Sequence, residues 1–144
     1  MKSIIILSVV AYIVACCLPA LEWKNDNKMP EHDIMLGLRA LAVGWSGIFA
    51  GIVAWFANPI WLLALCLAFF RKAWLGSIAG TIALLIALTV FNVVGRELPG
   101  DEGNVTKTRI VAVLPGAYVW FASIGLSILA AILGRKSWPA PTAG

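Results

Sequence analysis

The sequence predicts an all-α integral membrane protein: a four-helix transmembrane bundle with a kinked or broken second span and an outer interfacial segment. Two observations predict this class. Of the 144 residues, 61% are hydrophobic and only 12% are charged, whereas soluble domains are roughly 25% charged. Four long stretches also lack any Asp, Glu, Lys, Arg or His. The bilayer is therefore the expected solvent, and the length is expected to leave no room for a separate soluble catalytic domain.

The four uncharged stretches define the predicted spans. They are residues 3–21, 40–70, 75–94 and 110–134. A spanning helix requires roughly 20 apolar residues, so the first, third and fourth stretches each fit one span. We predict spans at about 3–21, 47–70, 75–94 and 110–134. They belong to a single polytopic membrane domain of residues 1–138, and residues 139–144 form a short cytoplasmic tail.

The second stretch is too long for one span and too short for two. Asn58 and Pro59 lie inside it, and because proline removes a backbone donor, a kink or break is expected there. Two interpretations of this region remain open. In one, an interfacial helix at about 30–43 precedes a tilted span at 47–70. In the other, a span ends before Asn58, and residues 60–70 return as a re-entrant segment.

Charge distribution favours four spans with both termini in the cytoplasm. With this topology the cytoplasmic segments hold five basic residues and no acidic one, whereas the outer loops hold all seven acids. Lys2 beside the first span is typical of a signal-anchor in a bacterial inner membrane. The segment that ends at Cys16 also resembles a bacterial lipoprotein cleavage site, so lipidation of Cys16 remains an alternative.

Small residues four positions apart predict close helix packing. Within hydrocarbon, helices associate through small residues that let their backbones approach and through polar contacts. Gly47 and Gly51 are expected to meet Gly76 and Gly80 in a tight hairpin of consecutive spans. Ser123 and Ser127 are expected to form a comparable face on the last span. Packing within one chain and packing between copies both fit this pattern.

The predicted spans contain no ionisable side chain other than cysteine and tyrosine. Ion-coupled transport and acid–base catalysis depend on such groups, so both are disfavoured. The sequence holds no catalytic motif and no cysteine or histidine spacing typical of a metal site. We therefore expect no enzyme activity, no cofactor and no metal. The scattered basic residues predict contact with lipid headgroups and not with nucleic acid.

These observations predict a protein that acts by binding. The expected function is an accessory, assembly or toxin-immunity-type subunit that binds another membrane protein, or itself as a homo-oligomer. The loop at 22–39 is the candidate partner surface, in which Arg39 is expected to pair with Glu31 or Asp33. The alternative is an oligomeric pore, a holin-like lesion former or a small-solute facilitator, with Asn58 and Pro59 on its polar path.

Overall fold

The computed structural model describes residues 2–25, 32–99 and 107–136, which form a mixed helix and sheet fold. They contain five α-helices and a four-stranded sheet. Two helices of this described part are long and apolar enough to cross a membrane, Ala73–Val93 and Pro115–Gly134. The predicted all-α, four-helix transmembrane bundle is therefore wrong. The predicted tail at 139–144 lies outside the described residues.

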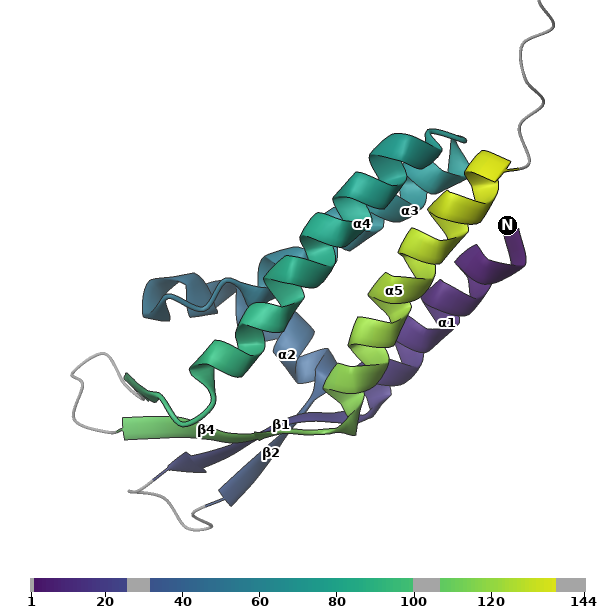
Figure 1. The fold of residues 1–144 in the computed structure, drawn as a ribbon. Helices are drawn as coiled ribbons and strands as arrows, with labels where there is room; N and C mark the ends of the chain where they lie inside the picture. Colours follow the sequence, from purple (N-terminus) through teal and green to yellow (C-terminus); the bar gives the residue numbers. More distant parts are fainter. Residues whose placement is uncertain (1, 26–31, 100–106, 137–144) are drawn as a thin grey trace, which may run out of the picture.

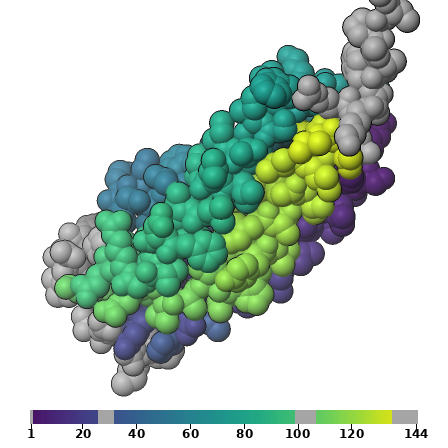
Figure 2. Space-filling view, viewed as in Figure 1, coloured from purple at the N-terminus to yellow at the C-terminus, as the bar shows by residue number. Residues whose placement is uncertain are grey.

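Four helices, of which the first and last connect directly to strands of the sheet, run side by side (Figure 1). They are α1 (Lys2–Cys17), α3 (Ala57–Phe69), α4 (Ala73–Leu88) and α5 (Pro115–Lys136), and the 3-10 helix η3 (Thr89–Val93) extends α4. Helix α5 packs against both α1 and α4, and α4 packs against α3. Figure 2 shows α4 and α5 in contact over this face. With 16 and 13 residues, α1 and α3 are shorter than the roughly 20 that a span requires.

The sheet is antiparallel, in the order β2-β1-β4-β3. Its strands are β1 (Pro19–Asn25), β2 (His32–Leu36), β3 (Glu97–Pro99) and β4 (Lys107–Val113). The predicted first span continued into β1, and the predicted fourth span began within β4. Both boundaries are wrong for the same reason. Where an uncharged part of a strand adjoins an apolar helix, hydrophobicity does not change at the boundary, although the backbone hydrogen bonds of the strand go to another strand.

The predicted second span is replaced by an arm and a separate helix. Helix α2 (Gly37–Val43) continues into the 3-10 helix η1 (Gly44–Ala50), and we call these residues the arm. At Gly51 the backbone adopts φ 73°, a left-handed conformation that favours glycine, and the chain turns back. After the short 3-10 helix η2 (Ala54–Phe56), α3 begins at Ala57. Neither sequence interpretation of this region describes an arm that folds back on itself.

Pro59 is the third residue of α3 and does not kink it. The backbone N–H groups of the first turn have no partner inside a helix, so a proline in this turn removes no helical hydrogen bond. The predicted break at Asn58 and Pro59 is therefore the beginning of a helix. The irregular chain lies before these two residues, at η2.

Many small side chains are buried between the helices beside Trp61, Leu65 and Ile124, and many large apolar side chains face outward. Seven alanines of α3, α4 and α5 are at most 1% exposed, whereas Leu62 and Leu85 are 57% and 62% exposed. A Cβ atom at Gly76 would lie 3.2 Å from the backbone nitrogen of Ala68 on α3. At Gly80 it would lie 2.6 Å from Cγ1 of Ile128 on α5. Glycine at these positions lets α4 approach both neighbours closely.

Replacing Gly76 or Gly80 with isoleucine is therefore expected to destabilise the fold by about 1–3 kcal/mol each, because overpacking forces side chains or backbone to shift. Thermal unfolding of the purified protein in mild detergent measures the effect. Gly125→Ile on α5 is the matched control, since no heavy atom lies within 4 Å of its added Cβ. Equal melting temperatures for Gly80→Ile and Gly125→Ile contradict the packing role.

Candidate functional site

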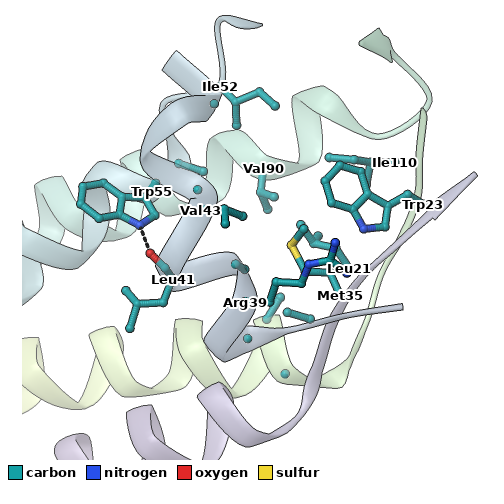
Figure 3. Close-up of a pocket in the computed structure, with 18 of the residues that line it drawn as sticks. Leu21, Trp23, Met35, Arg39, Leu41, Val43, Ile52, Trp55, Val90 and Ile110 are labelled. Carbon is teal, nitrogen blue, oxygen red and sulfur yellow. Dashed lines mark hydrogen bonds between the residues drawn. The ribbon is translucent and has the colours of Figure 1, made fainter. Parts of the chain in front are cut away.

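A cavity of about 750 Å³ lies between the sheet, the arm and the ends of the helices (Figure 3). Small-molecule sites in proteins commonly measure roughly 300–1,000 Å³ and are lined mainly by apolar side chains with a few placed polar groups. This cavity has that character. Its lining includes Leu21, Met35, Val43, Ile52 and Val90 together with a small number of polar residues.

The inner face of the sheet supplies one wall of the cavity. Trp23 on β1 is directly opposite Asp33 on β2 and Ile110 on β4, and Leu21 is opposite Met35. Side chains of paired residues project from the same face of a sheet, and residues two apart on a strand share that face. These five residues therefore project together, and all five line the cavity.

The outer end of the cavity carries its charged residues. Nη1 of Arg39, on α2, donates a 3.3 Å hydrogen bond to Oδ2 of Asp33. The side chains of these two residues are 60% and 65% exposed. The indole N–H of Trp23 is shielded from solvent and has no hydrogen-bond partner among the described residues. In Figure 3 the Arg39 side chain extends from α2 toward Met35 and Trp23.

The inner end of the cavity is a hydrogen-bonded cluster centred on Asn58. Its Oδ1 accepts hydrogen bonds from the Tyr12 hydroxyl of α1 and from Nε1 of Trp120 of α5, each at 3.0 Å. Tyr12 also stacks on Trp61 of α3, with ring centroids 4.1 Å apart. One amide oxygen therefore joins three helices.

The side-chain amide of Asn58 also forms a hydrogen bond with the backbone just before α3. The Trp55 carbonyl lies in η2, just before α3, and Pro59 supplies no N–H toward it. Nδ2 of Asn58 donates to this carbonyl at 2.9 Å. The indole N–H of Trp55 donates in turn to the carbonyl of Leu41 on α2, at 2.7 Å (Figure 3). The start of α3 is therefore tied to the arm.

The two predicted glycine pairs lie in different parts of the structure. Gly76 and Gly80 lie at helix contacts, whereas Gly47 and Gly51 lie in and after η1, where an added Cβ at Gly47 would meet Ile52. The expected hairpin of these two pairs does not form, because residues 44–50 are a 3-10 helix that turns at Gly51. Gly47 and Ile52 instead line the cavity.

Ser123 and Ser127 are fully buried on α5. Their hydroxyls donate to the carbonyls of Trp120 and Ile124, each at 2.7 Å. Ser8 of α1 donates to the backbone carbonyl of Ser123 at 2.7 Å and accepts a 3.3 Å hydrogen bond from Trp61 of α3. This second polar contact joins the same three helices as Asn58.

The predicted partner loop is the β1–β2 hairpin and the start of α2. Of the two predicted acidic partners of Arg39, Asp33 forms the ion pair and Glu31 lies outside the described residues. The sequence did not predict the cavity or the position of Trp23 in its lining. A tryptophan beside a predicted span end is expected at the membrane interface. The alternation of Leu21, Trp23 and Asn25 with charged residues was the available signal for a strand with one cavity face.

The outer face of the sheet carries ion pairs. Glu22 of β1 lies 3.0 Å from Nδ1 of His32 on β2, and Glu97 of β3 pairs with Lys107 at 2.8 Å and Arg109 at 3.3 Å on β4. The hydrogen bond from Lys107, followed by the charge of Lys107, lowers the pKa of Glu97 below its ordinary value. Unlike Asp33, these charged residues thus lie on the face of the strands opposite the cavity.

The lining of the cavity offers groups suited to binding. Within residues 2–25, 32–99 and 107–136, no group of three or more His, Cys, Asp or Glu side chains could hold a metal ion. The charged groups at the cavity are Asp33 and Arg39, which pair with each other. The remaining lining offers apolar contact and hydrogen bonds.

Comparison of the chain with protein-family models, with curated proteins and with solved structures finds no match.

The Asn58→Leu substitution is expected to lower the free energy of unfolding by about 1–3 kcal/mol, because it leaves the donors of Tyr12 and Trp120 without their acceptor. Chemical unfolding in detergent, followed by tryptophan fluorescence, measures the change. Asn92→Leu is the matched control at an exposed position. A loss no larger than that of Asn92→Leu contradicts the joining role of Asn58.

The Lys107→Gln substitution is expected to raise the pKa of Glu97 toward the ordinary glutamate value of about 4.3. A lowered pKa in the folded state means that the carboxylate stabilises the sheet above the unfolded pKa. This contribution is lost as pH falls through the folded pKa. A carboxyl carbon NMR titration measures the shift. Lys72→Gln, at the turn between α3 and α4, should leave the Glu97 pKa unchanged, and an equal response to both variants refutes the assignment.

Proposed function

We propose that this chain is a non-enzymatic membrane protein, embedded in the bilayer by its helices, that acts by binding another membrane protein. The distribution of side chains carries the proposal. Small alanines and serines are buried between the helices, whereas large apolar side chains cover their outer surfaces. The most exposed of these on the packed helices are Ile6, Ile13, Leu62, Phe69, Trp74 and Leu85.

Bilayer surroundings account for this distribution better than water does. Exposing apolar surface to water costs roughly 25 cal/mol for each Å², while contact with lipid tails carries no such cost. Residues 40–70 and 73–94 contain no charged side chain. The described ion pairs lie on the sheet and at the start of the arm. A bilayer boundary between the helices and the sheet would leave these ion pairs in water.

The arm supports a protein partner. Its exposed side chains include Trp45, Ile48 and Phe49, and Phe49 is 86% exposed. Large aromatic side chains frequently anchor protein interfaces. Because residues 40–50 are uncharged, this surface complements an apolar transmembrane segment and offers nothing to a charged soluble protein. The arm also extends away from the packed helices in Figure 1.

The pore alternative has less support. It required Asn58 and Pro59 to present unpaired polar groups along a conducting path. Asn58 instead uses its amide on Tyr12, Trp120 and the Trp55 carbonyl. The Trp55 carbonyl beside the proline is thereby hydrogen-bonded within the protein. The binding proposal therefore explains this region more simply.

Site-specific photo-crosslinking in native membranes tests the proposal. With benzoylphenylalanine in place of Phe49, we expect the chain in the membrane fraction after alkaline extraction and one adduct of defined mass. The same probe in place of Leu62, on the exposed face of α3, is the control for contact with random neighbours.

Introducing Ile48→Asn beside the probe should reduce the adduct several-fold. An adduct of twice the chain mass would identify a second copy as the partner. Recovery of the chain in the soluble fraction, or equal adducts from both probe positions, contradicts the proposal.

A further inference from the structure

The cavity changes character along the strands of the sheet. Leu21 and Met35 form a pair close to the helices, and Trp23 and Asp33 form the next pair on the same face. Since strand residues are spaced about 3.3 Å apart, this second pair lies roughly 7 Å further from the helices. Asn25 and Thr108, which are paired at the far ends of β1 and β4, complete the polar end. The cavity is thus apolar toward the helices and polar toward the outer end of the sheet.

The polar end presents donors that a ligand can use. The shielded indole N–H of Trp23 has no acceptor among the described residues. The guanidinium of Arg39 pairs with Asp33 through one 3.3 Å contact, and both side chains are largely exposed. Exposed pairs of this kind are weak and exchange readily. A guanidinium prefers to bind a carboxylate or phosphate through two parallel hydrogen bonds.

The inner end cannot hold the polar part of a ligand equally well. The donors of Tyr12 and Trp120 are both committed to the oxygen of Asn58. Between this cluster and Arg39, the lining is formed by apolar side chains that include Ala15, Leu21, Met35, Val90 and Ala117. A ligand that satisfies both ends must therefore be apolar along its length and carry acceptor oxygens at one end.

We propose that this cavity binds an amphiphile whose apolar chain ends in an oxyanion. The oxyanion lies between Arg39 and Trp23, where it replaces Asp33 as the acceptor for the guanidinium, and the chain runs toward Tyr12 and Trp120. A free fatty acid and a phospholipid of the bilayer share this chemistry. The cavity proposal is independent of the protein partner proposed above, because it rests on residues that line the cavity and not on the exposed side chains of Trp45, Ile48 and Phe49.

Direct binding to the delipidated protein in detergent tests the proposal. Native mass spectrometry is used with three probes: palmitate, hexadecanol and palmitoyl-oleoyl phosphatidylglycerol. Hexadecanol has the same chain length as palmitate and lacks the charge. We expect at least one of the two anionic probes to bind about tenfold more tightly than hexadecanol, as charged hydrogen bonds imply. The tighter anionic probe identifies the source of the ligand.

Variants separate the two ends of the cavity. Arg39→Gln should weaken binding of the anionic probe about tenfold and leave hexadecanol unchanged. Ala40→Phe places a large side chain in the lining and should weaken all probes. Arg96→Gln is the matched control, since Arg96 is an exposed arginine outside the lining. Thermal unfolding is recorded for each variant, so that loss of the fold is separated from loss of binding.

Three results would overturn the proposal. The first is that neither anionic probe binds the folded wild-type protein. The second is that hexadecanol binds as tightly as both anionic probes. The third is that Arg39→Gln, folded by its melting curve, binds the anionic probe as tightly as Arg96→Gln does.

Discussion

The side-chain amide of Asn58 is the interaction on which the arrangement of the helices depends. Nδ2 of Asn58 donates to the Trp55 carbonyl just before α3, and its Oδ1 accepts hydrogen bonds from donors on α1 and α5. In an apolar environment each of these groups would be costly to leave unpaired. A single side chain therefore lets α3 begin at this point and fixes it against two other helices. Residues before Asn58 are then free to leave the helical layer as the arm.

The packing follows from the size of the side chains between the helices. Ala57, Ala64, Ala83 and Ala87 are fully buried, so the helix axes can approach closely and dispersion contacts can extend over the backbone. Hydroxyl groups contribute the remaining specificity: Ser8 connects Trp61 of α3 to the backbone of α5. Three large apolar side chains, Trp61, Leu65 and Ile124, are also buried in this interior, while many others cover the outside. Close helix approach and a few hydrogen bonds therefore accompany these larger apolar contacts in the interior.

The sequence predicted the apolar helices far better than the strands. Residues 75–94 and 110–134 were predicted as spans, and the structure has apolar helices at Ala73–Val93 and Pro115–Gly134. The strands were missed because hydropathy over a window of about 19 residues cannot separate a short apolar strand from the helix that follows it. The left-handed turn at Gly51 and the bonds of Asn58 depend on partners distant in sequence. Composition and spacing carry no information about such contacts, so the cavity could not be predicted.

The cavity exists because the sheet and the arm enclose a volume that the helices do not fill. Strands β1 and β4 lead directly into or out of helices, so the inner face of the sheet is held close to the helix ends. The arm closes one side, and Trp55 holds it through the Leu41 carbonyl. Trp55 also lies within η2, the segment that leads to Asn58. The same cluster that joins the helices therefore positions the arm, and through Arg39 it positions the polar end of the cavity. Arg39 and Leu41 lie on the same short helix, α2. A ligand that bound Arg39 would therefore contact the element that Trp55 connects to the start of α3.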